Sequence, residues 1–245
     1  MIISGGASGI GLATAEVLAA AGRKVALLDL DAGAARSCAR GLSGSEHLGL
    51  RADVTNTDSV VEAVEIVEAE LGRIDGVVAC AGVVDPSPSE TVTDDSLRRL
   101  IDIHLLGTVR LARATFPALA RSPHGALVAM SSMGARLGVP QRLGYNAAKA
   151  GIEGVIRTLA VEWVGHGIRA NAVAPGWVKT PAIARLIGSG FLDPTPIVDR
   201  TPAGRFAEPD EIADVIAFLL NPRSSYLTGQ SIAVDGGMTI QCPAP

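Results

Sequence analysis

The stretch "IISGGASGIGLA", Ile2 to Ala13, joins a short apolar run to an Ala-rich helical run. Its glycines follow the spacing GxxxGxG at Gly5, Gly9 and Gly11, with Gly6 as an extra member. Glycine lets the backbone turn tightly and approach a pyrophosphate, and the N-terminus of the next helix offers N–H groups and a positive dipole end. The spacing therefore predicts a dinucleotide site at this strand-to-helix turn. The expected contacts are Gly5, Ser8, Gly9, Ile10 and Gly11.

An acidic residue ends the next apolar run, 18 residues after the last glycine of the motif. This residue, Asp29, can accept hydrogen bonds from the adenosine ribose hydroxyls, and its charge would repel a 2′-phosphate. No compensating cation is offered by Ala7 or Ser8 in the loop, or by Leu30 after the acid. These residues predict NAD rather than NADP as the coenzyme, with Asp29 and Leu30 beside the adenosine.

Outward from this turn, strand-like apolar runs alternate with helical runs along the chain. Strands are expected over 1–4, 24–31, 47–54, 75–82, 125–132, 168–176 and 230–237. Helices are expected over 9–22, 57–72, 93–120, 208–222 and around Tyr145. This alternation is typical of a parallel sheet with right-handed crossovers. The sequence predicts an α/β fold, a Rossmann-like, doubly wound, mostly parallel seven-stranded sheet with helices on both faces, in a single domain over 1–245.

Bulk composition excludes several classes of protein. The net charge of −4 comes without a basic block, which argues against a nucleic-acid partner. The cysteines Cys38, Cys80 and Cys242 form no CxxC pair and the four histidines have no ligand spacing, so no disulfide framework or metal site is expected. No apolar run reaches the ~18 residues of a membrane span, and no signal peptide is visible. A cytoplasmic location is expected.

Two residue pairs close predicted strands and should lie at the ligand-binding carboxyl edge of the sheet. They are Asp53–Val54 and Ala81–Gly82. Asp53 suits either a hydrogen bond to the adenine amino group or a capping role in a turn.

One long stretch, Val178 to Phe206, shows no clear periodicity. Its ends are rich in Pro and Gly and its middle is apolar, and loops of this length are usually functional lids or disordered. We expect a substrate-binding flap at about 181–204. A helical protrusion or an oligomer contact is the alternative.

The chain has two tyrosines, and Tyr145 lies four residues before Lys149 in an Ala/Gly-rich run. At that helical spacing a phenol and an ammonium lie on one face, one turn apart. A nearby cation favours the ionised phenol, so the pair is either an acid/base centre or part of a solvated helix surface.

These motifs together resemble the short-chain dehydrogenase/reductase superfamily in its common form of about 250 residues. The matching pieces are "SGGASGIG", Asp29, Asp53-Val54, "CAG", "SS" at 131–132, "YNAAK", "NAVAPGWVKT" and "RFAEPDEIADVIAFLLNPRSSYLTGQSIAVDGG". The resemblance implies that Tyr145 is the acid/base and that Lys149 binds the nicotinamide ribose and lowers the tyrosine pKa. It also implies that Ser132, 13 residues before Tyr145, orients the substrate oxygen. The nicotinamide contacts implied are Pro175, Gly176, Val178 and Thr180.

The implied activity is NAD(H)-dependent interconversion of a secondary alcohol and a ketone. An NADP(H)-dependent 3-oxoacyl-type ketoreductase and a non-catalytic nucleotide-sensing protein are the alternatives. The expected pocket, formed by residues after Val83, 133–141, Trp177 and the flap, is mostly apolar and favours a neutral, moderately hydrophobic alcohol. The resemblance also implies a homotetramer or homodimer built through helices at about 95–120 and 145–165. The close-packing face of the second helix would be Ala147, Ala148, Gly151 and Gly154.

Three positions depart from the family pattern. His104 stands where the family usually has an asparagine that anchors a water next to the lysine. A histidine there either relays protons near neutral pH and alters the pH dependence, or only fills space. Ala79 replaces an asparagine that stiffens the central sheet, and the first strand begins at Met1, so either the true start lies upstream or the strand is clipped.

Overall fold

The computed structural model describes residues 1–242, and the seven strands in that range form one sheet in the order β3-β2-β1-β4-β5-β6-β7. Every neighbouring pair is parallel, so the predicted doubly wound sheet is confirmed and is wholly rather than mostly parallel. The strands are β1 (Ile2–Ser4), β2 (Ala26–Asp29), β3 (Leu48–Arg51), β4 (Gly76–Ala79), β5 (Ala126–Met130), β6 (Arg169–Pro175) and β7 (Ser231–Val234). The strand order reverses between β1 and β4, which opens a crevice at their carboxyl ends.

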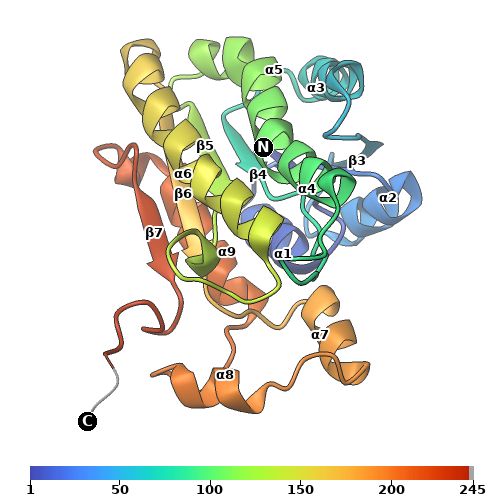
Figure 1. Cartoon of the computed structure of the whole chain (residues 1–245). Helices are drawn as coiled ribbons and strands as arrows, with labels where there is room; N and C mark the ends of the chain where they lie inside the picture. The colour runs from blue at the N-terminus through green and yellow to red at the C-terminus, as the bar shows by residue number, and fades with distance from the viewer. Residues whose placement is uncertain (243–245) are drawn as a thin grey trace.

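Helices cover both faces of the sheet (Figure 1). One face is covered by α1 (Gly9–Ala20), α2 (Ala32–Gly41) and α9 (Pro209–Leu220), and the other by α3 (Thr57–Leu71), α5 (Gly107–Arg121) and α6 (Leu143–Trp163). Side chains alternate along each strand, so Ile2 and Val77 enter one apolar core while Ile3 and Val78 enter the other. The sequence analysis missed α2, which begins where Asp31 accepts hydrogen bonds from the amides of Gly33 and Ala34.

The long helix expected over 93–120 is interrupted. It consists of α4 (Asp94–Ile101), a π-helical turn over Asp102–Leu106, and α5. A π turn carries one extra residue in a helical turn and re-aims the side chains that follow it. His104 lies in this turn and is thereby buried rather than left on the helix surface.

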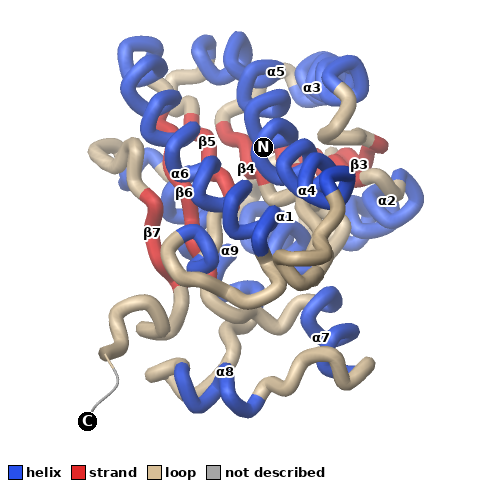
Figure 2. Tube along the Cα trace, in the orientation of Figure 1, coloured by secondary structure: helices blue, strands red, loops and turns tan. Residues whose placement is uncertain are grey.

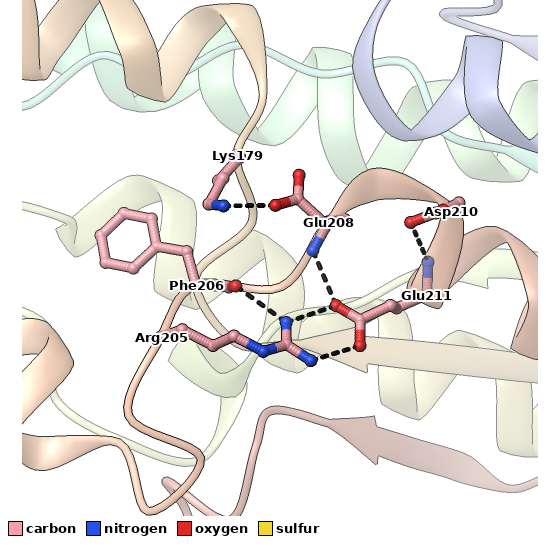
Figure 3. A network of polar contacts seen from close by, with 6 residues as sticks. All are labelled: Lys179, Arg205, Phe206, Glu208, Asp210 and Glu211. Atoms are coloured by element: carbon pink, nitrogen blue, oxygen red, sulfur yellow. Dashed lines mark hydrogen bonds and ion pairs between the residues drawn. The ribbon is translucent and has the colours of Figure 1, made fainter.

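The stretch 178–206 is helical where no periodicity was recognised. It contains α7 (Pro181–Gly188) and α8 (Thr195–Arg200), which lie together at one end of the molecule, joined by loops (Figure 2). Its two ends run side by side, since Lys179 N donates to Ala207 O and Ala207 N to Trp177 O, both at 2.9 Å. Two ion pairs stabilise the place where these ends run side by side (Figure 3). Lys179 pairs with Glu208, and Arg205 pairs with Glu211 at 2.6 Å. The segment predicted to be a flap therefore consists of two short helices on an anchored base.

The small-residue face of α6 was expected to join subunits, but part of it packs against other residues of the same chain. Ala148 is buried, and a Cβ added at Gly151 would come 3.0 Å from the Leu105 side chain. Ala147 is exposed and Gly154 is half-buried. In residues 1–242 no helix is both long enough and apolar enough to cross a membrane.

Candidate active site

The predicted site residues converge on one cleft of about 1090 Å³ that includes the β1/β4 crevice. All of them line it except Gly11. They are Gly5, Ser8, Gly9, Ile10, Asp29, Leu30, Asp53, Val54, Ala81, Gly82, His104, Ser132, Tyr145, Lys149, Pro175, Gly176, Val178 and Thr180. Gly11 lies behind the loop, where an added Cβ would come 2.2 Å from the Gly5 carbonyl oxygen. Its role is to let two stretches of backbone touch.

The glycine loop adopts backbone angles that only glycine takes without strain. Gly5 has φ +65° and Gly9 has φ +53°. Ser8 precedes α1 and its side chain caps none of the first amides of that helix. Free amides and the positive end of the helix dipole therefore meet the cleft, which suits an anionic pyrophosphate. An added Cβ at Gly9 would come 3.3 Å from Thr180, so the loop also lies against the base of the flap.

A serine hydroxyl links the glycine loop to the segment after β4. Ser4 Oγ accepts hydrogen bonds from the amides of Cys80 at 3.2 Å and Ala81 at 3.3 Å. Ala79 cannot make the side-chain bonds of the family asparagine, and Ser4 holds the neighbouring backbone instead. The sequence analysis missed this link, although a hydroxyl residue directly before Gly5 was visible.

The two acids at the adenosine end are held by backbone amides. Asp29 accepts from Ala7 N at 3.2 Å and from Asp31 N at 3.3 Å, which fixes its carboxylate beside the glycine loop. Asp53 accepts from the amide of Thr55 at 2.9 Å and its hydroxyl at 2.7 Å, and these bonds lower the Asp53 pKa. Of the two roles considered for Asp53, the turn is the one seen in these contacts.

Ser132, Tyr145 and Lys149 meet where β5 leads into α6. Lys149 Nζ lies 5.4 Å from the centre of the Tyr145 ring and donates to Met130 O at 2.6 Å. Ser132 Oγ accepts from the amide of Gly134 at 3.1 Å, which fixes the hydroxyl next to the phenol.

The neighbouring Ser131 has a structural part. Its hydroxyl donates to Lys149 O at 3.3 Å and to Glu153 at 3.2 Å. These bonds fasten β5 to α6, so Ser132 is the serine left to face the phenol.

Burial dominates the electrostatics of this group. It lowers the pKa of Lys149 to about 8 and raises the pKa of Tyr145. Ser132 and Arg142 oppose the rise for Tyr145. The direction is opposite to the one expected from the lysine neighbour, because burial of the phenol outweighs the groups that favour its ionised form. The Lys149 ammonium donates to the Met130 carbonyl.

His104 is buried between the end of the cleft that the glycine loop lines and the end that the predicted flap lines. Its Nε2 lies 2.8 Å from Val83 O, and its ring meets Tyr145 edge-on at 5.2 Å. Burial, with Lys149 nearby, lowers the His104 pKa to about 3. This low pKa argues against the relay alternative and favours the space-filling one, and the relay is tested by the pH profile of a His104 variant. The imidazole instead fills the space beside Gly82, where an added Cβ would come 2.4 Å from the ring.

The substrate end of the cleft is less apolar than expected. Its apolar lining includes Val83, Met133, Val139, Trp177 and Leu186. Charged residues line the cleft as well: Asp85, Arg99, Asp102, Arg142 and Arg185. These charged side chains were not part of the mostly apolar pocket that the sequence predicted, and one of them, Arg142, lies only three residues before Tyr145.

The chain is similar to known proteins over nearly all of its length. A family model described as enoyl-(acyl carrier protein) reductase matches residues 5–239. A cis-4-hydroxycyclohexanecarboxylate dehydrogenase of Sinomonas cyclohexanicum is 38% identical over 97% of this chain and 95% of its own. A 3-oxoacyl-(acyl-carrier-protein) reductase of Thermotoga maritima is 36% identical over 98% of this chain and 97% of its own.

Two further matches extend the comparison. An uncharacterized short-chain type dehydrogenase/reductase y4vI of Sinorhizobium fredii is 38% identical over 99% of this chain, which spans 44% of that protein's length. Among solved structures, the crystal structure of gox2181 superposes with a TM-score of 0.93 at 39% identity, over 98% of this chain and 95% of that one. The whole described architecture thus has a close structural counterpart.

Proposed function

Because this chain belongs to the short-chain dehydrogenase/reductase family of oxidoreductases, we propose that it uses NAD(H) to interconvert a secondary alcohol and a ketone. The observation that carries the proposal is the convergence of Ser132, Tyr145 and Lys149 on the cleft that the glycine loop opens into. The proposal treats residues 1–245 as one coenzyme-binding and catalytic unit.

Each residue of the group has a chemical task in this proposal. Bound NAD supplies the acceptor for the hydride of the carbinol carbon. Tyr145 takes the hydroxyl proton of the alcohol as the phenolate, a form that the Lys149 ammonium and the positive charge of bound NAD would favour against the burial of the ring. Ser132 donates a hydrogen bond to the oxygen as its charge develops. Lys149 holds positive charge near the phenol and the coenzyme ribose. Its pKa of about 8 keeps it largely protonated at neutral pH.

The coenzyme preference is proposed from the adenosine end. A carboxylate fixed beside the glycine loop favours ribose hydroxyls and disfavours a 2′-phosphate. The second candidate is an NADP(H)-dependent 3-oxoacyl-type ketoreductase, which the Thermotoga maritima relative favours and Asp29 opposes. Titration of the protein with NAD and NADP separates the two.

The proposal is tested by NAD reduction over a panel of secondary alcohols with wild-type protein, Tyr145→Phe and Tyr226→Phe. Tyr226 is the other tyrosine of the chain and is fully exposed, so its variant is a matched control. Loss of the acid/base should lower kcat/KM by about 100- to 10,000-fold in Tyr145→Phe, with Tyr226→Phe at the wild-type value. If Tyr145→Phe is as active as wild type, Tyr145 is not the acid/base. If neither protein reduces NAD with any alcohol of the panel, a nucleotide-sensing role is favoured instead.

A homo-oligomer is proposed alongside this activity. Apolar side chains are exposed on α6 and just after it at Val161 and Val164, and on α9 at Phe218. Single exposed apolar residues are common, but Val161 and Val164 lie three residues apart at the end of α6, and such a pair suits contacts between copies. Sedimentation of wild type and Val161→Glu would show whether the α6 face contributes.

A further inference from the structure

Arg142 is a buried arginine whose charge has no partner in the described chain. It caps the start of α6, and its side chain lines the cleft while only 8% exposed. In residues 1–242 its guanidinium makes no hydrogen bond or ion pair, and the one ionisable group that acts on it is Tyr145. Its backbone is held in place, since Arg142 O accepts from Asn146 N at 2.7 Å.

A second buried arginine shows how the fold treats a guanidinium that only supports structure. Arg169 is 9% exposed, and its guanidinium donates to Leu219 O, Asn221 O and both oxygens of Ser224 at 2.8–3.3 Å. Three of these four acceptors are main-chain carbonyl oxygens, and the fourth is the Ser224 hydroxyl. A buried charge without such partners costs several kcal/mol. In residues 1–242 the Arg142 guanidinium has no such partners and opens onto the cleft near Tyr145, where a bound ligand can supply the oxygens.

The surroundings of Arg142 define the ligand's chemistry. Val139, Met133 and Trp177 also line the cleft and offer apolar contact for a carbon skeleton. Arg99 lines it too, but it lies 3.8 Å from the carboxylate of Asp85. Lys149 is the other buried cation of the cleft, but its ammonium donates to Met130 O and has its task beside the phenol. Arg142 is then the buried cation available to the substrate, which matches a monoanion better than a dianionic phosphate. A guanidinium fork meets the two oxygens of a carboxylate with paired hydrogen bonds.

We propose that Arg142 binds a carboxylate on the substrate, so that the substrates are secondary hydroxy acids and the corresponding keto acids. The proposal rests on the proposed oxidoreductase function and deepens it. Arg142 and Tyr145 stand three residues apart at the start of α6, so one helical turn holds the carboxylate and the carbinol. The neutral alcohol favoured by the sequence analysis is replaced by an anionic one.

Arg142 also acts on Tyr145, because its charge lowers the pKa of the phenol. Removing the charge would slow chemistry on every substrate, whatever group the arginine binds. The conservative variant Arg142→Lys separates the two effects. It keeps the charge next to Tyr145 and removes the planar fork that a carboxylate pairs with.

The test compares hydroxy acids with their neutral amides in wild-type protein. The probes are 4-hydroxypentanoate, 5-hydroxyhexanoate and 4-hydroxycyclohexanecarboxylate, each with its carboxamide. Wild type should prefer the best acid over its amide by at least about 10-fold in kcat/KM. Arg142→Gln should lower kcat/KM for that acid about 100-fold, and Arg142→Lys about 10-fold, with the amide within about threefold of wild type in Arg142→Lys. Equal losses on acid and amide in both variants would overturn the proposal.

A comparison variant and a binding measurement make the assignment specific. Arg185 is an exposed cation of the same cleft, on the flap. If Arg185→Gln, and not Arg142→Gln, removes the preference for acids, the carboxylate is bound elsewhere and the proposal fails. Calorimetric titration with hexanoate and hexanamide, which do not react, tests Arg142 without turnover. Hexanoate binding that Arg142→Gln abolishes would support the proposal even if no alcohol is oxidised, and equal affinity for both probes would refute it even in an active enzyme.

Discussion

The coenzyme end of the cleft is formed largely by main chain, whereas the substrate end is formed by side chains. At the coenzyme end, the turn through Gly5 and Gly9 presents backbone amides, and the side chains of Ser4 and Asp29 are bound to backbone N–H groups. At the substrate end, side chains from the segment after β4, the loop before α6 and the flap face one another. The two ends meet at His104 and Tyr145.

The difference shows what each end is able to recognise. A backbone surface is the same for any sequence that keeps its glycines, so it suits a ligand shared across a family, such as a dinucleotide. A surface of side chains changes with every substitution, so it suits a ligand particular to one protein. A charge such as that of Arg142 therefore carries more information on substrate than the whole glycine loop does.

The largest expected effect comes from adding one methyl group at Gly11, where two stretches of backbone at the coenzyme end are in contact. In Gly11→Ala the new Cβ would lie 2.2 Å from the Gly5 carbonyl, and backbone on both sides must move. We expect a loss of stability of about 3 kcal/mol and NAD binding weakened more than about 100-fold. Gly41→Ala is the control, because an added Cβ there meets nothing within 4 Å. Urea unfolding and NAD titration measure both effects, and wild-type values for Gly11→Ala would show that the loop is not close-packed.

The contrast between the two ends of the cleft also explains which parts of the site could be predicted from the sequence. The glycine spacing and Asp29 follow from local rules, since a strand, a turn and a helix adjacent in the chain form the site. Ser4 pairs with amides 76 and 77 residues away, and no local pattern announces that contact. The π turn was hidden because the apolar period of a helix continues through it. An arginine is expected at the surface from sequence alone. Arg142 is buried in the cleft because segments distant in the sequence fold around it, and no local pattern predicts that.

Burial of His104 predicts how the free energy of unfolding changes with pH. Its pKa is about 3 in the folded chain against an ordinary 6.5, so between these values the unfolded chain binds a proton that the folded chain does not. The stability that comes from keeping the ring neutral is complete above pH 6.5 and is lost as pH falls, by about 1.4 kcal/mol per pH unit. His104→Asn cannot titrate, so its stability should fall less steeply than that of wild type between pH 6 and 4, by about 3 kcal/mol in total.

Urea unfolding at pH 7, 6, 5 and 4 measures the slopes, and His104→Gln separates titration from packing because it should share the shallower slope. The pH profile of kcat between pH 6 and 9 should be the same in wild type and His104→Asn. A profile that shifts with the substitution would restore the relay that burial argues against.

The smallest expected effect concerns Asp29, the acid at the main-chain end that is proposed to contact the adenosine ribose. Asp29→Asn keeps an oxygen for the amide of Ala7 but removes the negative charge. We expect NAD affinity to fall about tenfold and NADP affinity to rise, because a charged acceptor is worth about 1.5–3 kcal/mol and the repulsion of a 2′-phosphate disappears. Asp31→Asn is the matched control, since Asp31 caps α2 and Asn caps a helix equally well. If Asp29→Asn bound NAD and NADP with the wild-type affinities, the charge of Asp29 would play no part in the choice between them. The backbone amides of the glycine loop would then have to provide that discrimination.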